Sequence, residues 1–301
     1  WQPSLERIKA SNLKRFAESL ERDLGKRFDD YESLHAWSCE APDVFWAQIW
    51  QFTEIRSSRQ WDAVLSDADQ FPGARWFEGA RLNFAENLLR HRSDKPALIA
   101  RLENGARKTV TYNELFDQVS ECAAGLRQLG VVSGDRVAGF MPNIPETIVA
   151  MLATASVGAI WSSCSPDFGI NGVMDRFGQI EPKVLFGCDG YFYNGKTIDT
   201  LPRLKAICSK IESIEQLVVV PVIQDAVAID GFGNAVLFHD FLSAHRGAEL
   251  FCEQLPFNHP LYLMYSSGTT GAPKCIVHSA GGTLIQHLKE HQLHVDLKPS
   301  D

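Results

Sequence analysis

The chain has 301 residues, of which 45% are hydrophobic and 22% are charged, a composition typical of a globular protein with a large core. Its formal net charge of -8, without a long basic run, argues against a nucleic-acid-binding surface. No segment approaches the roughly 20 apolar residues that a membrane-spanning helix needs, so we expect no membrane insertion.

The seven cysteines form no C-x-x-C pair and no Cys/His cluster with zinc spacing. They lie in or beside apolar runs, as small buried thiols do, which favours a reduced, cytoplasmic protein. The chain begins at Trp1, without Met and without the apolar core of a signal peptide. We therefore expect the natural chain to begin a few residues upstream.

Residues 1–90 are predicted to form a mainly helical layer. We expect one apolar helix face there to pack against a larger domain rather than to bind a ligand. Residues 83–90 predict a short helix with Phe84 and Leu88 facing inward. The residues that share the apolar face at helical spacing are Phe45, Trp46, Ile49 and Trp50.

Residues 91–301 are predicted to form an α/β domain, because short apolar runs alternate with helical stretches. The runs are apolar along their whole length, which indicates a mostly parallel sheet with helices on both faces. Thr111 and Glu114 form a capping box at the start of one helix. The predicted strands are 96–100, 136–141, 159–162, 184–187 and 216–220, and the helices between them include 145–157, 170–180 and 201–213.

The segment 261–279 is predicted to form a strand, a loop and a second strand. Its loop, 266–274, has the order S-S-G-T-T-G-A-P-K and combines hydroxyl groups, glycines and one lysine. Glycines let backbone N–H groups approach phosphate oxygens, hydroxyls contact phosphate or Mg²⁺, and lysine supplies a positive charge. A flexible surface turn is the alternative that composition alone favours, but the fixed order favours phosphate binding. The loop is not a Walker A motif, because Gly268 and Gly271 are too close together.

This loop resembles the phosphate-binding signature of the adenylate-forming enzymes, which include acyl-CoA synthetases, luciferases and peptide-synthetase adenylation domains. Its flanks, 264–271 and 273–282, are similar to the acyl-CoA synthetases that activate acetoacetate, whereas those for acetate usually carry T-S-G-S-T-G-x-P-K-G. Three further stretches, 76–89, 158–169 and 286–291, also resemble that branch, so the resemblance covers essentially the whole chain.

The resemblance implies an ATP-dependent ligation in two steps. The carboxylate of acetoacetate attacks the α-phosphorus of ATP, and the thiol of coenzyme A then attacks the acyl-adenylate and releases AMP. ATP, Mg²⁺ and coenzyme A are the implied cofactors. Lys274 and Thr270 are the catalytic candidates, with Thr270 near the metal. The residues implied to hold the β- and γ-phosphates are Ser266, Ser267, Gly268, Thr269, Thr270, Gly271 and Lys274.

Weaker matches concern the other substrates. The stretch 193–196 falls where acetate-activating relatives carry an R-G-G-[RK] turn that contacts coenzyme A, but only Gly195 and Lys196 match. A surface Asn-Gly turn is a slightly favoured alternative. Trp161 and the residues from Ser162 to Ser165, at the carboxyl end of a predicted strand, line the acyl pocket or pack in the core.

His278 has a fixed place in the related pattern but no assigned chemistry, and we expect it to be a buried, hydrogen-bonded structural histidine. The later motifs of the family are missing: the adenine-binding segment, the acidic residue near Mg²⁺, the ribose-binding aspartate, the hinge and the C-terminal lysine. We therefore expect an inactive N-terminal portion of a roughly twofold longer enzyme, with an uncovered sheet edge that promotes self-association. A ligase for another short acid and a non-catalytic binding module are the alternatives.

Overall fold

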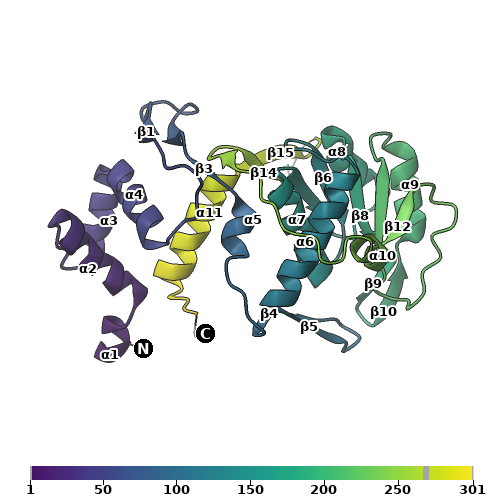
Figure 1. Ribbon diagram of the computed structural model, residues 1–301, viewed down its shortest axis with the longest axis horizontal. Helices are drawn as coiled ribbons and strands as arrows, with labels where there is room; N and C mark the ends of the chain where they lie inside the picture. The colour runs from purple at the N-terminus through teal and green to yellow at the C-terminus, as the bar shows by residue number, and fades with distance from the viewer. Residues whose placement is uncertain (1, 267–270, 300) are drawn as a thin grey trace. The chain divides into compact units, whose positions relative to one another are not determined.

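The computed structural model describes residues 2–266, 271–299 and 301, and the chain divides into two compact units (Figure 1). Unit 1 comprises Trp1–Leu82, Leu255–His259 and Ala280–Asp301, and unit 2 comprises Asn83–Gln254 and Pro260–Ser279. The predicted division had one boundary near residue 90. The observed grouping differs from it because two later segments return to unit 1.

Unit 1 combines helices with short antiparallel strands. The strands between residues 63 and 82 were not part of the predicted helical layer. The later segments join it through the pairing of Leu255 with Leu82, and through hydrogen bonds from Asn12 to Asp296 and Leu297. Its elements are α1 (Leu5–Lys9), α2 (Asn12–Leu24), α3 (Tyr31–Glu40), α4 (Pro42–Phe52), β1 (Ala63–Ser66), β2 (Arg75–Glu78), β3 (Arg81–Leu82), β13 (Leu255–Pro256), α11 (Ala280–Lys289) and the π-helix η1 (Glu290–His294).

Aromatic rings form much of the core of unit 1. Trp50 is buried and stacks on Phe77 at 4.8 Å between ring centroids, and Phe77 lies 4.8 Å from Phe257. Ile49 is fully buried, whereas Phe45 and Trp46 are half-buried. The predicted apolar face of α4 thus packs within unit 1.

Unit 2 is built on a seven-stranded sheet, counted over the described residues, in the order β12-β11-β8-β6-β7-β14-β15. All pairings in it are parallel except β14 with β15. The sheet strands are β6 (Arg136–Phe140), β7 (Ile160–Cys164), β8 (Val184–Cys188), β11 (Gln216–Val220), β12 (Ala235–Leu237), β14 (Pro260–Ser266) and β15 (Lys274–Ser279).

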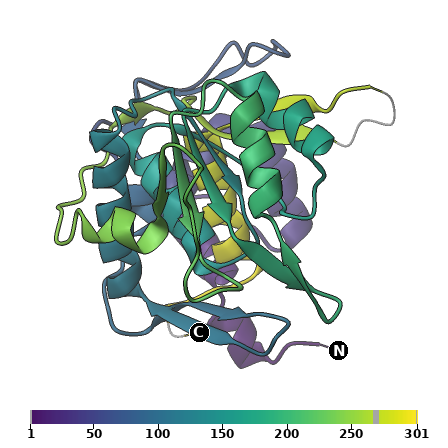
Figure 2. The same ribbon diagram turned by 90° about the vertical axis from the view of Figure 1, so that its right-hand side faces the viewer.

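Helices cover both faces of this sheet, as the sequence predicts. Leu185 packs with the helices of one face, and its neighbour Phe186 lies 6.2 Å from Phe241 on the other face. Figure 2 shows α9 and α10 on opposite sides of the strands. One face carries α8 (Ile170–Ile180) and α9 (Leu201–Lys210), and the other carries α6 (Tyr112–Gln128), α7 (Pro145–Val157) and α10 (Phe238–Ser243). The predicted α/β fold class is confirmed.

Two hairpins and one short helix complete unit 2. β4 (Pro96–Arg101) pairs, within the described ranges, with β5 (Arg107–Thr111) alone, so the strand predicted at 96–100 does not join the parallel sheet. β9 (Gly190–Tyr193) pairs with β10 (Lys196–Asp199), which the sequence did not predict. The short helix, α5 (Phe84–Leu88), buries Phe84 but leaves Leu88 exposed, so the inward orientation predicted for Leu88 is wrong. Over the described part of the chain, no helix combines the length and the apolar character needed to cross a bilayer.

Asn83 is a fully buried polar residue that ties three segments of unit 2 together. Its Oδ1 accepts a hydrogen bond from the Glu86 backbone N–H at 3.2 Å, which caps α5. Its Nδ2 donates to the carbonyls of Ala155 at 3.0 Å and Glu253 at 2.9 Å. One side chain therefore provides hydrogen-bond partners for backbone groups at the start of α5, at the end of α7 and in a distant loop.

Gly139 makes room for a tryptophan ring. A Cβ at Gly139 would lie 2.7 Å from two atoms of the Trp161 ring, a distance that requires a shift. Trp161 is 5% exposed, and its ring lies 6.3 Å from that of Phe186. The absence of a side chain at Gly139 thus leaves room for the Trp161 ring in the core.

We expect Asn83→Ala to lower the free energy of unfolding by about 2–4 kcal/mol, because buried carbonyls lose their donor and α5 loses its cap. Urea denaturation measures the change. Asn171→Ala, at an exposed position of α8, is the control and should change stability by about 0.5 kcal/mol or less. Asn83→Asp keeps the oxygen that caps α5 but loses the N–H donors. If it lowers the free energy of unfolding as much as Asn83→Ala does, the contacts with the carbonyls account for the destabilisation. Wild-type stability in Asn83→Ala would contradict the role described.

We expect Gly139→Ala to destabilise the protein by about 1–3 kcal/mol, because the new methyl group overlaps the Trp161 ring. Thermal unfolding followed by tryptophan fluorescence measures it. Gly169→Ala is the matched control, since Gly169 has a φ of -67° and no atom within 4 Å of an added Cβ. Adding Trp161→Phe to Gly139→Ala should restore part of the lost stability. If it restores none, the methyl group at position 139 does not act through the Trp161 ring.

Candidate active site

The hairpin of β14 and β15 carries the predicted phosphate loop at its tip. Ser266 and Lys274, the predicted residues at the two ends of the loop, lie opposite each other in the ladder. Gly271 has a φ of +91°, which favours glycine, and open space where a Cβ would project. The other predicted loop residues, Ser267, Gly268, Thr269 and Thr270, lie outside the described residues.

Lys274 is exposed at the start of β15. Within the described ranges, no carboxylate forms an ion pair with it. An exposed ammonium group beside a glycine-containing loop is available to a phosphate.

Tyr265 and Ser162 join the hairpin, next to its loop, to the neighbouring strand. Ser162 Oγ donates to the Leu263 carbonyl at 2.8 Å and lies 3.3 Å from the Tyr265 hydroxyl. Burial raises the pKa of Tyr265 to about 12, although the contact with Ser162 acts in the opposite direction. The phenol is therefore protonated at neutral pH, and it can donate a hydrogen bond but not act as a base.

Two of the sequence predictions concern residues near this hairpin. Trp161 is packed in the core, and Ser162 is 1% exposed, so the roles of both in substrate binding stay predictions. His278 is exposed, opposite Tyr262 on the edge strand. The prediction that His278 is buried is wrong, because β15 is an edge strand that pairs, among the described residues, with β14 alone.

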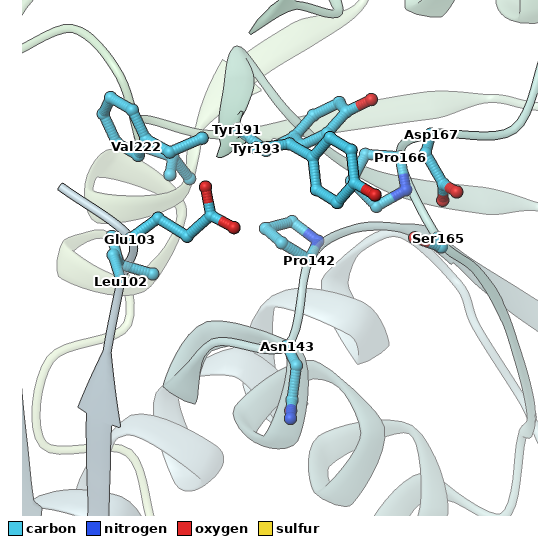
Figure 3. A pocket seen from close by; sticks show the side chains of 11 residues that line it. Leu102, Glu103, Pro142, Asn143, Ser165, Pro166, Asp167, Tyr191, Tyr193 and Val222 are labelled. Carbon is cyan, nitrogen blue, oxygen red and sulfur yellow. The ribbon is translucent and has the colours of Figure 1, made fainter. Parts of the chain in front are cut away.

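A pocket of about 350 Å³ lies where several strands of the sheet end (Figure 3). Figure 3 shows the Glu103 carboxylate and the Tyr193 ring facing the same space beside Pro142, while Asn143 points away. The lining is rich in aromatic side chains, and Glu103 and Asp167 are its charged residues. It consists of Leu102, Glu103, Pro142, Asn143, Ser165, Pro166, Asp167, Tyr191, Phe192, Tyr193 and Val222.

The sheet topology explains why a pocket forms here. The chain leaves β6 toward β7 in one direction, whereas it leaves the adjacent β8 toward β11 in the other. Connections that diverge from neighbouring parallel strands leave a crevice at their carboxyl ends, and open α/β sheets bind ligands there. The pocket is lined by the segments that follow β6, β7, β8 and β11, so it occupies this crevice.

Two polar side chains hold the walls of this pocket. The fully buried carboxylate of Asp189 accepts hydrogen bonds from the backbone N–H groups of Val222, Ile223 and Gln224, at 2.6–3.1 Å. Arg203 donates to the Pro166 carbonyl at 2.7 Å. Both residues fix backbone rather than face the cavity, so the pocket is largely preorganised.

Gly195 and Lys196, predicted to contact coenzyme A, lie at the tip of the β9–β10 hairpin. Asn194 and Gly195 have φ values of +50° and +71°, as in the tight Asn-Gly turn that was the favoured alternative. Lys196 pairs with Tyr193, which lines the pocket. The β9–β10 hairpin follows β8 and the loop 266–274 follows β14, and β6 and β7 lie between these two strands in the sheet, so the two predicted binding regions are separate.

Sequence reasoning missed the aromatic pocket, Asp189 and Arg203. The available signal was the position of polar and aromatic residues directly after each predicted strand. In the described ranges, no group of three His, Cys, Asp or Glu residues could hold a metal ion.

Comparisons with known proteins place the chain in a family. Residues 84–301 match the model of the AMP-binding enzyme family, and residues 31–88 match that of the acetyl-coenzyme A synthetase N-terminus. The acetoacetyl-coenzyme A synthetase of Rhizobium meliloti (strain 1021) is 46% identical over 302 residues, which cover 100% of this chain and 46% of that protein. The malonamoyl-CoA synthetase of Penicillium aethiopicum is 41% identical over 97% of this chain and 42% of that protein.

A solved structure gives the same relationship. The acetoacetyl-CoA synthetase from Streptomyces lividans matches with a TM-score of 0.94 and 43% identity, over 99% of this chain and 46% of that one. This chain thus spans just under half the length of the relatives it matches. Because the AMP-binding enzyme model matches well over half of the sequence, the chain belongs to the AMP-binding enzyme family.

Proposed function

We propose that the complete polypeptide carrying this chain is a ligase that joins acetoacetate to coenzyme A at the expense of ATP. The reaction passes through an acyl-adenylate and releases pyrophosphate and AMP. The observation that carries the proposal is the similarity, over the whole chain, to relatives named acetoacetyl-CoA synthetase. The phosphate loop, with Ser266 opposite Lys274, is consistent with it.

In the first half-reaction the loop residues would hold the β- and γ-phosphates of ATP. The Lys274 ammonium is exposed at the loop and would offset the charge that develops on the departing pyrophosphate. Backbone N–H groups near Gly271 would approach phosphate oxygens, since no Cβ intervenes. Binding in this way would orient the α-phosphorus toward the carboxylate of the acid.

Mg²⁺ would neutralise phosphate charge when bound. The described residues offer no cluster of three ligands for it. The predicted contact of this chain with the ion is the Thr270 hydroxyl, together with the phosphates that the loop would hold.

The aromatic pocket would take the nucleotide part of coenzyme A. Tyr191 and Tyr193 line it and offer rings against which an adenine can stack, and Lys196 lies directly opposite Tyr193. Its separation from the phosphate loop is compatible with this role, because a flexible arm links the nucleotide of coenzyme A to its thiol. Gly195 would let the hairpin backbone turn tightly beside it.

A ligase for another short acid is the second candidate. The observation that favours it is the malonamoyl-CoA synthetase at 41% identity, since this relative differs from the others in the acid it is named for. Acetoacetate and malonamate both carry a carbonyl group two bonds from the carboxylate. A pocket that hydrogen-bonds this carbonyl would reject acetate.

We also propose a cytoplasmic location and a tendency to self-associate. All seven cysteines are free, and burial raises the pKa of Cys188 and Cys208 to about 11, which keeps these thiols unreactive. Met264, Ile276 and Val277 are exposed on the edge hairpin, where apolar residues favour pairing with a second strand.

We expect the complete polypeptide to catalyse acetoacetate-dependent ATP–pyrophosphate exchange, with kcat/KM at least about tenfold higher for acetoacetate than for acetate. The 301-residue chain alone should run at least about tenfold slower, because binding contacts that position ATP are then missing. A preference for malonamate would favour the second candidate. The absence of exchange with every acid tested would indicate a binding module. Equal rates for the short and complete chains would contradict the need for further residues.

We expect Lys274→Ala to slow adenylation by about 10- to 150-fold, since one charge-assisted contact contributes about 1.5–3 kcal/mol. Lys274→Arg should rescue only in part, because a planar fork does not replace a compact ammonium. Lys210→Ala, which removes an exposed lysine from the last turn of α9, should leave the rate unchanged. Wild-type exchange in Lys274→Ala would show that the lysine is dispensable.

A further inference from the structure

The strand that begins with Lys274 has little packing to fix its position. In the described sheet β15 pairs only with β14. Ile276 and Val277 are 45% and 57% exposed, and Cys275 is half-buried against the core, so both faces of the strand are only partly covered. The ladder supplies most of the contacts that hold such an edge strand, so any further contact near the loop matters for the position of Lys274.

Gln179, on the last turn of α8, contacts the chain on both sides of Lys274. Its Nε2 donates to the carbonyl of Pro273 at 3.0 Å. Its Oε1 lies 3.7 Å from the Sγ of Cys275, which donates to it. The same Nε2 also donates to the Asp175 carbonyl of α8, so both of its hydrogens are used and the amide orientation is set.

The same helix also holds the opposite strand of the hairpin. The Arg176 guanidinium lies 5.6 Å from the Tyr265 ring centroid and 4.7 Å from that of Phe168. Its Nη1 donates to the Gly172 carbonyl at 2.7 Å, which keeps the planar group in place. Tyr265 pairs with Cys275 in the ladder, so α8 contacts both strands one residue pair before the loop.

We infer that Gln179 is a positioning residue for Lys274: its side-chain amide holds the backbone at Pro273 and Cys275, and through it the lysine ammonium. This inference rests on the proposed function, in which Lys274 meets phosphate. A small rotation of the backbone at position 274 moves a charge at the end of a four-carbon side chain much further than it moves the Cα. A contact between an electrostatic donor and a transition state is sensitive to such displacement.

Limited trypsin digestion tests the contact itself without reference to activity. Trypsin cleaves after Lys274, and we expect Gln179→Ala to accelerate this cut by about 3- to 10-fold, as loss of one or two hydrogen bonds would. Gln216→Ala is the matched control, because Gln216 also donates to two backbone carbonyls, those of Leu217 and Asn234, away from the hairpin. It should leave the rate of this cut unchanged.

ATP–pyrophosphate exchange by the complete polypeptide tests the consequence. Gln179→Ala should lower kcat by about 3- to 10-fold, with less than about a twofold change in the KM for acetoacetate. In a Lys274→Ala background the same substitution should change kcat by less than about twofold, because the lysine through which it acts is gone. Gln179→Glu, which cannot donate to Pro273, should resemble Gln179→Ala, whereas Cys275→Ser keeps a donor and should resemble wild type.

Equal trypsin rates in Gln179→Ala and wild type would overturn the inference, as would a Gln179 effect that is equally large without Lys274. Faster cleavage after Lys274 in Gln179→Ala would support it, provided that the effects of Gln179→Ala and Lys274→Ala on kcat are not additive. The two tests can also disagree. If Gln179→Ala accelerated cleavage but the wild-type polypeptide showed no exchange with any acid, the contact between Gln179 and the hairpin would be confirmed. The proposed function, and the role of Gln179 in catalysis, would be refuted.

Discussion

The parallel ladder that joins β6 to β7 and β8 is the constraint on which the rest of unit 2 depends. It brings the carboxyl ends of these strands to one edge, and the connections that leave β6 and β8 diverge there. The crevice between them becomes the aromatic pocket. The ladder also determines which side chains reach each face: Leu185 enters the core under α8 and α9, and Phe186 that under α10.

Buried polar residues hold the segments that the ladder cannot reach. Asn83 joins the start of α5 to the end of α7, and Asp189 holds three consecutive backbone N–H groups of the turn after β11. Each replaces hydrogen bonds that regular structure would otherwise supply. The cost of leaving such groups unsatisfied makes these contacts specific as well as stabilising. The resemblance noted for residues 76–89 therefore includes a residue whose role here is structural.

The alternation of apolar strands and capped helices was enough to predict the α/β class, and the order of the loop 266–274 was enough to predict the family. These signals are local. The return of α11 to unit 1 depends on contacts such as Asn12 with Asp296, which lie 284 residues apart and leave no periodic signal. The aromatic pocket is equally non-local, since Leu102 and Val222 meet in it from distant parts of the chain. The exposure of His278 depends on the strand order, because a run such as 275–277 looks the same at an edge as in the centre of a sheet.

The location of the loop on an edge hairpin creates a conflict between access and order. In the function proposed for it, the loop must be open to a large, charged ligand, so the strands that carry it cannot both be buried in the sheet. Yet an electrostatic contact is effective only if its donor is already in place before the charge develops. Apolar packing over the loop would fix its position but block access to it. Polar contacts to the residues on either side of Lys274, and to the opposite strand, fix the position and leave the loop accessible. Gln179 and Arg176 are contacts of this kind, and the helix they share is anchored in the core by Val173 and Phe177. The position of the loop is thus fixed mainly by contacts from α8, which is packed on the sheet, rather than by the packing of the strand that bears Lys274.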